Sequence, residues 1–235
     1  MIYVGIDDTD TLDDPGTNQL ARHLVRELAG QFRGRMILRH QLLEDPRVPC
    51  TKKNGCASIL FERTTSIPLA DFIAKLRQMI VAWSPRGSDP GLCVCEDVPQ
   101  SVKEWGLRCQ RELVTQSDAR EIAAENGIHL EGLGGTEDGV IGALAAIGLM
   151  ATQNDGRVIY FGHQGGDWYD LTGCIDVNEI RALGVDEILV TDTGKSLTAG
   201  IVDVGKRLRP NYRRGKIVLY VAQSDTPHWE AVRVT

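Results

Sequence analysis

The chain has 235 residues, of which 42% are hydrophobic and 25% are charged, and its formal net charge at pH 7 is −6. This composition is typical of a globular protein with a sizeable core, and the acidic balance argues against a general nucleic-acid-coating protein. No stretch approaches the ~20 apolar residues of a membrane span, and the N-terminus lacks a signal-peptide pattern, so we expect a cytoplasmic protein without a membrane partner.

The first hundred residues carry a regular alternation of strand and helix patterns. Apolar runs predict strands over residues 2–6, 36–43, 57–61 and 92–95, and helical spacing predicts helices over residues 18–31 and 69–83. The order β-α-β-β-α-β is that of the split βαβ, or ferredoxin-like, unit. We therefore expect a ferredoxin-like lobe over residues 1–100.

The remaining residues are less regular. They predict helices over residues 101–112, 117–125, 140–151 and 178–183, and strands over residues 158–161, 187–191 and 217–222. No long flexible linker separates these elements from the first lobe. The fold class that we expect is α/β (α+β), as one compact domain over residues 1–235 with a second α/β lobe, 101–235, packed on the first.

The six cysteines contain no CxxC pair. Cys93 and Cys95 alternate along a predicted strand and so share one face. We expect them to be reduced core residues, which agrees with a cytoplasmic location.

The first predicted strand runs directly into the acidic sequence GIDDTD, which holds Asp7, Asp8 and Asp10, with Asp13 and Asp14 close behind. Two carboxylates a few ångströms apart repel by roughly 1 to 4 kcal/mol. A turn alone does not need that cost, whereas a divalent cation would offset it. Hard carboxylate oxygens suit Mg²⁺, so we predict a magnesium site formed by Asp7, Asp8 and Asp10.

Two other interpretations of this segment stay open. Its aspartates and threonines could simply cap the next helix and form a polar turn. The segment also approaches the DxDGT motif of haloacid-dehalogenase phosphatases, in which Asp8 or Asp10 would be the nucleophile, although the glycine is missing.

Three further segments could contact a phosphate. Thr17 is predicted to be the N-cap of the following helix, where the helix dipole favours an anion. Lys52 and Lys53 precede Asn54 and Gly55 at the entry of a strand, where a lysine could bind a triphosphate or merely flank a turn.

The glycine-rich sequence LGGTEDG precedes the apolar helix predicted over residues 140–151. Gly134, Gly135 and Gly139 could let the backbone approach a phosphate at the helix N-terminus. Alternatively, the glycines and alanines of this region serve close helix packing.

A basic cluster stands out against the acidic balance of the chain. Its members are Lys206, Arg207, Arg209, Arg213, Arg214 and Lys216, and Tyr212 lies among them. The cluster is either a solvated surface or a contact for phosphate or RNA.

Three segments occur together and in a fixed order: GIDDTD with Thr17 seven residues beyond Asp10, then KKNGCASILFE, then GGTEDGVIGALAAIG. In combination they resemble the kinase domain of the archaeal tRNA-Ile agmatidine synthetase (TiaS) family, over residues 1 to about 148. Because the chain ends at Thr235, we expect a short homologue without the OB-fold and zinc-ribbon regions of that family.

The resemblance implies a domain that uses ATP and Mg²⁺ to phosphorylate a wobble cytidine and one of its own threonines. By position, Asp7, Asp8 and Asp10 would hold metal and triphosphate, and Thr17 would match the phosphorylated threonine. The remaining matches would contact the nucleotide: Lys52, Lys53, Asn54, Gly55, Gly134, Gly135, Thr136 and Gly139.

The leading hypothesis is therefore an ATP/Mg²⁺-dependent phosphotransferase that acts on a nucleotide, RNA or small-molecule acceptor. The alternatives are a metal-dependent phosphohydrolase of the haloacid-dehalogenase type and a non-catalytic nucleotide- or RNA-binding module. The oligomeric state does not follow from the sequence.

Overall fold

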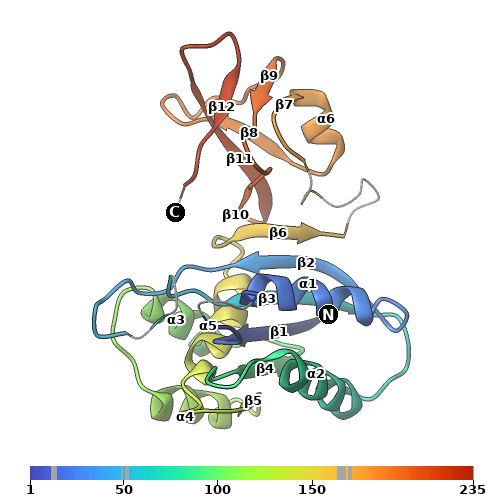
Figure 1. The fold of residues 1–235 in the computed structure, drawn as a ribbon, viewed down its shortest axis with the longest axis vertical. Helices are drawn as coiled ribbons and strands as arrows, with labels where there is room; N and C mark the ends of the chain where they lie inside the picture. Colours follow the sequence, from blue (N-terminus) through green and yellow to red (C-terminus); the bar gives the residue numbers. More distant parts are fainter. Residues whose placement is uncertain (12–14, 49, 51–52, 163–167, 169–170, 235) are drawn as a thin grey trace. The chain divides into compact units, whose positions relative to one another are not determined.

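A computed structural model describes residues 1–11, 15–48, 50, 53–162, 168 and 171–234 (Figure 1). The chain divides into two compact units, an N-terminal unit of Met1–Thr152 and a C-terminal unit of Gln153–Thr235. Both units contain helix and strand, five helices in the described part of the first and one in that of the second, so the predicted α/β class is confirmed. The division differs from the boundary expected at residue 100, because the helices beyond that residue pack against strands of the N-terminal unit.

The sheet of the N-terminal unit has the strand order β5-β4-β1-β3-β2, and every neighbouring pair is antiparallel. The strands are β1 (Ile2–Asp7), β2 (Phe32–Arg39), β3 (Ala57–Arg63), β4 (Gly91–Cys95) and β5 (His129–Gly132). The order of the first four, β4-β1-β3-β2, is that of the split βαβ unit predicted from the sequence. The short strand β5 extends this sheet at the edge formed by β4.

Helices cover both faces of this sheet. They are α1 (Thr17–Glu27), α2 (Leu69–Trp83), α3 (Gln100–Cys109), α4 (Gln116–Glu125) and α5 (Gly139–Ala151). Phe72 of α2 packs against Phe32 and Phe61 on the face that also carries Ile2. Helix α5 lies on the opposite face, because it meets β1 at Gly5, and side chains alternate along a strand.

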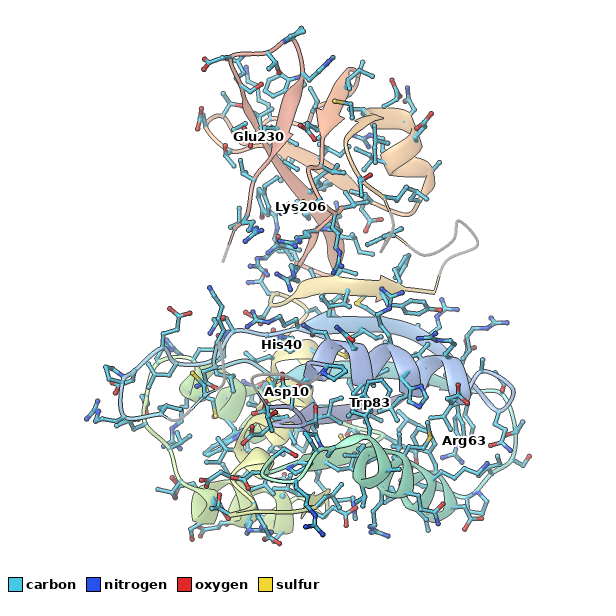
Figure 2. All side chains as sticks on the ribbon, viewed as in Figure 1. Asp10, His40, Arg63, Trp83, Lys206 and Glu230 are labelled. Atoms are coloured by element: carbon cyan, nitrogen blue, oxygen red, sulfur yellow. The ribbon has the colours of Figure 1, made fainter. Side chains whose placement is uncertain are left out.

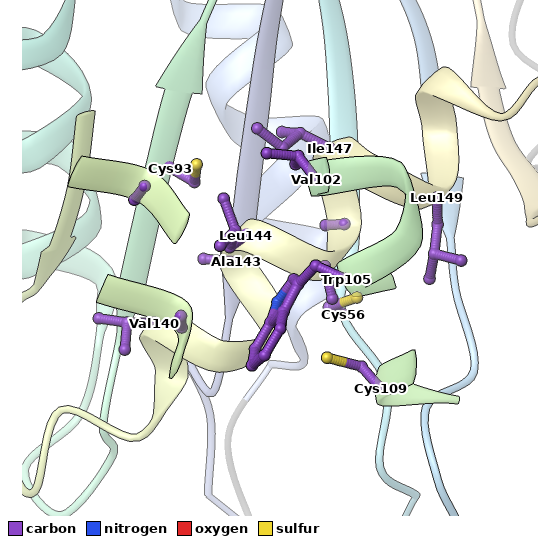
Figure 3. Packing of buried hydrophobic residues seen from close by; sticks show 14 of the residues in the cluster. Cys56, Cys93, Val102, Trp105, Cys109, Val140, Ala143, Leu144, Ile147 and Leu149 are labelled. Carbon is purple, nitrogen blue, oxygen red and sulfur yellow. The ribbon is translucent and has the colours of Figure 1, made fainter. Parts of the chain in front are cut away.

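Helix α5 is buried on nearly all sides and forms the centre of a hydrophobic cluster (Figure 3). A Cβ atom on Gly5 would overlap the carbonyl group of Ala143, so only glycine allows this approach of strand and helix. On its outer side α5 contacts α3, where Trp105 donates a hydrogen bond of 3.2 Å from Nε1 to the carbonyl oxygen of Ile141. A Cβ atom on Gly148 of α5 would overlap the carbonyl oxygen of Val102 in α3. Glycines at both contacts therefore let α5 serve as the core of the unit.

The C-terminal unit is built mainly from short strands around β11 (Lys216–Gln223). Strand β11 pairs antiparallel with β10 (Asn211–Arg213) and β12 (Trp229–Ala231), and parallel with β8 (Glu187–Val190). The other elements of the unit are β6 (Arg157–Phe161), β7 (Cys174–Asp176), α6 (Val177–Ala182) and β9 (Ile201–Asp203). Arg214 and Gly215 both have positive φ, which is the requirement of a tight two-residue hairpin turn between β10 and β11.

The predicted elements are present, with shifted ends. Helix α1 ends at Glu27 rather than at residue 31, and β2 begins at Phe32 rather than at residue 36. Strands β5, β7, β9, β10 and β12 were not predicted, because segments of three or four residues show no measurable periodicity. Tertiary pairing, not local sequence, makes these segments strands.

All six cysteines are free thiols, and Cys93 and Cys95 are buried in β4, as predicted. Within the described residues, no helix combines the length and the apolar character needed to cross a bilayer.

The approach of α5 to β1 gives a first testable prediction. We expect Gly5→Ala to lower the free energy of unfolding by about 2 kcal/mol or more, because its Cβ would overlap backbone atoms, which cannot move aside as a flexible side chain can. Gly30→Ala is the matched control, because no atom lies within 4 Å of its added Cβ. Urea unfolding measures both variants, and equal stability of the two would contradict this account of the β1–α5 contact.

Candidate functional site

A cavity of about 780 Å³ opens in the N-terminal unit at the carboxyl end of β1. Its wall comes from the segment after β1, the connection between β2 and β3, the end of α3 and the beginning of α5. The lining residues used below are Asp7, Asp8, Asp10, Thr17, Leu42, Leu43, Val48, Lys53, Asn54, Gly55, Asp89, Leu113, Val114, Asp138, Gly139, Ile141 and Gly142.

Antiparallel pairing brings carboxylates from distant parts of the chain to one wall of this cavity. Because Asp7, the last residue of β1, pairs with Gly91, the first residue of β4, the loops beyond them meet. The backbone N–H of Asp89 donates a hydrogen bond of 3.1 Å to the carbonyl oxygen of Asp8. Asp138, the N-cap of α5, lines the same wall, and Figure 2 shows Asp10 in this region.

Asp7 lies against the first turn of α5. A Cβ atom on Gly142 would overlap the Asp7 carboxylate, so glycine at this position makes room for that group. Burial raises the pKa of Asp7 to about 7, and the negative charges of Asp8 and Asp10 add to the effect, whereas the backbone N–H of Asp8 and the charge of Arg39 oppose it. A group held in this way favours a proton or a nearby cation over an isolated charge.

Asp8 has a φ of 51°, in the left-handed region that non-glycine residues rarely occupy. Burial raises its pKa to about 6, with further contributions from the negative charges of Asp89, Asp10 and Asp138. Strained backbone and opposed carboxylates at one residue are both features that cluster at functional sites.

Asp89 is held in place by the glycine-rich segment that precedes α5. Its Oδ1 accepts a hydrogen bond of 2.8 Å from the backbone N–H of Thr136, and its Oδ2 lies 2.8 Å from the Thr136 hydroxyl oxygen. A Cβ atom on Gly135, whose φ is 57°, would overlap the Asp89 carboxylate. The structure thus places Gly134, Gly135 and Thr136 around Asp89, and of this segment it is Asp138 and Gly139 that line the cavity.

The cavity is also lined by apolar residues and by Lys53. The apolar lining residues are Leu42, Leu43, Val48, Leu113, Val114 and Ile141. The Lys53 side chain is 67% exposed, and its Nζ lies 3.9 Å from Glu44 Oε1, which leaves it room to turn towards a bound anion. Lys52, the other lysine predicted here, lies outside the described residues, as do Asp13 and Asp14.

Asn54 and Gly55 line the cavity and also hold its backbone together. The Asn54 side-chain amide donates a hydrogen bond of 2.8 Å to the carbonyl oxygen of Leu43, and the Leu42 N–H donates one of 3.0 Å to the carbonyl oxygen of Asn54. A Cβ on Gly55 would come within 2.7 Å of the carbonyl oxygen of His40. The predicted Asn-Gly entry to β3 therefore has a structural role in joining the two sides of the β2–β3 connection.

Thr17 lines the cavity, but the prediction that it caps α1 is wrong. The N-cap is Gly16, and Thr17 is the first helical residue, because the carbonyl oxygen of Gly16 already accepts helical hydrogen bonds from Gln19 and Leu20. Thr17 is 8% exposed, and its hydroxyl oxygen accepts a hydrogen bond of 3.1 Å from the buried hydroxyl of Thr9.

Among the residues that the structure describes, no group of three or more His, Cys, Asp or Glu side chains has the arrangement of a metal site. The aspartates predicted to bind a cation do line one cavity, as Asp7, Asp8 and Asp10 all contribute to its wall. Magnesium is usually held by one or two carboxylates together with substrate phosphates, so the predicted magnesium site stays a prediction.

Sequence analysis missed Asp89 and Asp138. Asp89 lies in no recognisable motif, whereas Asp138 lies in the glycine-rich sequence LGGTEDG, in which only the glycines and Thr136 were candidate contacts. Both are distant from GIDDTD along the chain. A signal for Asp89 did exist, because the predicted split βαβ order places the start of the last strand beside the end of the first. Any acidic residue just before that strand is then a candidate neighbour of Asp7 and Asp8.

The raised pKa of Asp7 gives a prediction on stability. Between its ordinary pKa of about 3.8 and its folded pKa of about 7, the folded protein binds more protons at Asp7 than the unfolded chain does. The free energy of unfolding should therefore fall as pH rises across this window. Asn keeps the shape of the side chain and cannot ionise, so Asp7→Asn should be more stable than wild type at pH 8 by about 1 kcal/mol or more.

Urea unfolding at pH 5 and pH 8 without divalent ions tests this prediction. Asp71→Asn, which replaces an exposed aspartate of α2, is the matched control and should follow the wild type. An identical pH dependence of Asp7→Asn and wild type would show that Asp7 is an ordinary surface carboxylate.

The sequence matches no established family profile. It is 29% identical over 157 residues to the tRNA(Ile2) 2-agmatinylcytidine synthetase TiaS of Pyrococcus horikoshii, which covers 63% of this chain and 35% of that protein. The TiaS of Thermococcus sibiricus is also 29% identical, over 153 residues, with the same shares covered. The chain thus spans about a third of the length of these curated relatives.

Solved structures agree with the sequence matches. A crystal structure of a TiaS–tRNA(Ile2)–ATP complex superposes with a TM-score of 0.56 at 21% identity, covering 63% of this chain and 36% of that chain. Apo TiaS gives a TM-score of 0.55 at 21% identity, with 63% and 35% covered. At this identity the superposition shows that the fold is shared. The resemblance predicted from GIDDTD and the glycine-rich segment is confirmed: over 63% of its length, this chain is similar in sequence and in fold to part of the TiaS synthetases.

Proposed function

We propose that the N-terminal unit binds ATP together with Mg²⁺ and transfers a phosphoryl group to a nucleotide, RNA or small-molecule acceptor. One observation carries the proposal. Asp7 and Asp8, both with raised pKa values, line a nucleotide-sized cavity beside the first turn of α5. Cavities of about 300–1,000 Å³ are typical of small-molecule and cofactor sites.

The carboxylates of the cavity fit a divalent cation chemically. Besides burial, the charges of Asp8 and Asp10 raise the pKa of Asp7, and the charge of Asp10 raises the pKa of Asp8. A cation among these carboxylates would offset the cost of ionising them. When bound, Mg²⁺ would neutralise charge on the β- and γ-phosphates of the nucleotide. Asp89, hydrogen-bonded to the backbone of Asp8 and to Thr136, would hold the Asp8 segment in position.

The remaining walls fit a nucleoside triphosphate. The apolar residues between Leu42 and Ile141 offer a surface for a base and sugar, and Lys53 supplies a mobile positive charge for phosphate oxygens. Gly139, the first residue of α5, lines the cavity, and the dipole of a helix favours an anion at its N-terminus.

In the proposed reaction an acceptor oxygen forms a bond to the γ-phosphorus of ATP while the bond from that phosphorus to the ADP oxygen breaks. The proton of a hydroxyl acceptor leaves to solvent or to a carboxylate. The work of the protein is to align the two oxygens and to balance the charge. Lys53 would balance charge on the phosphates, and the aspartates would hold the Mg²⁺.

The comparisons support an ATP-using activity related to tRNA modification. The relatives are named tRNA(Ile2) 2-agmatinylcytidine synthetases, and one structural neighbour is a complex of TiaS with tRNA(Ile2) and ATP. Transfer of that activity to this chain is part of the proposal, because the matches cover about a third of those proteins. For the RNA partner, the basic cluster of residues 206–216 is the candidate contact.

The proposal predicts that MgATP stabilises the protein. At 100 times its dissociation constant the ligand should raise the free energy of unfolding by roughly 2.7 kcal/mol, and ATP with EDTA should give far less. Asp8→Asn should abolish the Mg²⁺-dependent part, since Asn tolerates the same left-handed φ but carries no charge. Thermal melts of wild type, Asp8→Asn and the control Asp71→Asn measure the effect.

The products of the reaction separate the competing functions. Release of ADP with label on an acceptor supports phosphoryl transfer, and free phosphate from simple monoesters supports a phosphohydrolase. MgATP stabilisation without any turnover would show a binding module. Equal melting shifts with Mg²⁺ and with EDTA would contradict a carboxylate-held metal in this cavity.

A further prediction is that Thr17 becomes phosphorylated when the protein is incubated with MgATP. Thr17 lines the cavity beside the aspartates, and it begins α1, where a phosphate is electrostatically favoured. Intact-mass analysis should show one added phosphoryl group on wild type and none on Thr17→Val, which keeps the shape of the side chain. Phosphate that persists on the valine variant would move the site elsewhere.

A further inference from the structure

The C-terminal unit gathers positive charge that its sequence spreads over two segments. Lys206, Arg207 and Arg209 precede β10, whereas Arg233 follows β12 near the end of the described chain. We call these four residues the arginine surface. Lys206, Arg207 and Arg233 are exposed, and Arg209 is partly buried; Figure 2 marks Lys206 within this unit.

Two hydrogen bonds bring the end of the chain back to β10 and β11. The backbone N–H of Val232 donates a hydrogen bond of 3.0 Å to the carbonyl oxygen of Tyr220. This bond continues the pairing of β12 with β11. The side chain of Asn211, in β10, is buried, and its Nδ2 donates a hydrogen bond of 2.9 Å to the carbonyl oxygen of Val234. Arg233 lies between these two fixed points and is thereby held next to the segment that contains Arg209.

The grouped cations repel one another. Partial burial lowers the pKa of Arg209, and the positive charges of Arg233 and Arg207 lower it further. Within the described part of the chain, none of Lys206, Arg209 and Arg233 forms an ion pair with a carboxylate. Neighbouring cations differ, since Arg214 and Lys216 share Glu187.

We propose that the arginine surface binds the phosphate backbone of a nucleic acid. Arg209 and Arg233, which lie together without carboxylate partners in the described part of the chain, are suited to phosphates, which each accept two parallel hydrogen bonds from a guanidinium. Such a backbone also relieves the repulsion between the arginines and releases its own counterions. The inference rests on the RNA partner of the proposed function and places the contact in the C-terminal unit, outside the part that carries the ATP cavity.

The test is binding of a fluorescein-labelled single-stranded RNA of mixed sequence at increasing KCl, measured by fluorescence anisotropy. The affinity of wild type should fall steeply with salt. In a plot of the logarithm of the binding constant against the logarithm of the KCl concentration, the slope should be about −0.7 for each phosphate contacted. The double variant Arg209→Gln/Arg233→Gln should bind at least about tenfold more weakly. Its slope should be shallower by roughly 1.4, because two phosphate contacts are lost.

Two variants control for effects on folding and on general charge. Arg209→Lys/Arg233→Lys keeps both charges and should retain most of the affinity. Lys195→Gln removes an exposed cation that follows β8 and does not belong to the arginine surface. This variant should bind RNA as wild type does. Thermal melts with MgATP, run on every variant, report the ATP cavity separately.

Unchanged RNA binding by the glutamine variant would overturn the inference, as would the absence of RNA binding by wild type. Competition by polyglutamate as effective as that by unlabelled RNA would also overturn it, in favour of an acidic protein partner. If arginine-dependent RNA binding is found but MgATP gives no stabilisation, the inference stands and the ATP part of the proposed function fails.

Discussion

The close contact between β1 and α5 is the constraint on which the candidate site depends. Gly5 lets the helix backbone approach the strand at Ala143, and the neighbouring Gly142 makes room for the carboxylate of Asp7. Since side chains alternate along a strand, a helix placed over Gly5 must also lie over Asp7. The same packing that fills the core therefore carries a carboxylate out of water at the edge of the cavity and raises its pKa to about 7.

This arrangement opposes the stability of the protein without a ligand. Asp8 sits in a left-handed conformation, and Asp89 and Asp138 add negative charge beside it. Residues that lower stability are retained where function requires them, since replacing them would otherwise make the protein more stable. The costs are met by rigid surroundings: Thr136 fixes Asp89, and Asn54 joins the two sides of the β2–β3 connection.

The two units carry different evidence of function. The N-terminal unit contains the cavity and the motifs GIDDTD and GGTEDG. In the C-terminal unit the evidence of function is the distribution of charge and the pairing of the strands. The return of the chain after β12 adds Arg233 to Arg207 and Arg209, which makes a local run of cations into a surface with a defined shape.

The sequence by itself determined the α/β class, the order of the split βαβ unit and the role of GIDDTD as a cluster of carboxylates beyond a strand. These features are local: periodicity over five to fifteen residues specifies a strand or helix, and strand order follows from the sequence of elements. Tertiary structure alone decided that Gly135 and Thr136 surround Asp89 and that Arg233 joins Arg209. Each of these depends on contacts between residues far apart along the chain, whose free energy no local window of sequence contains.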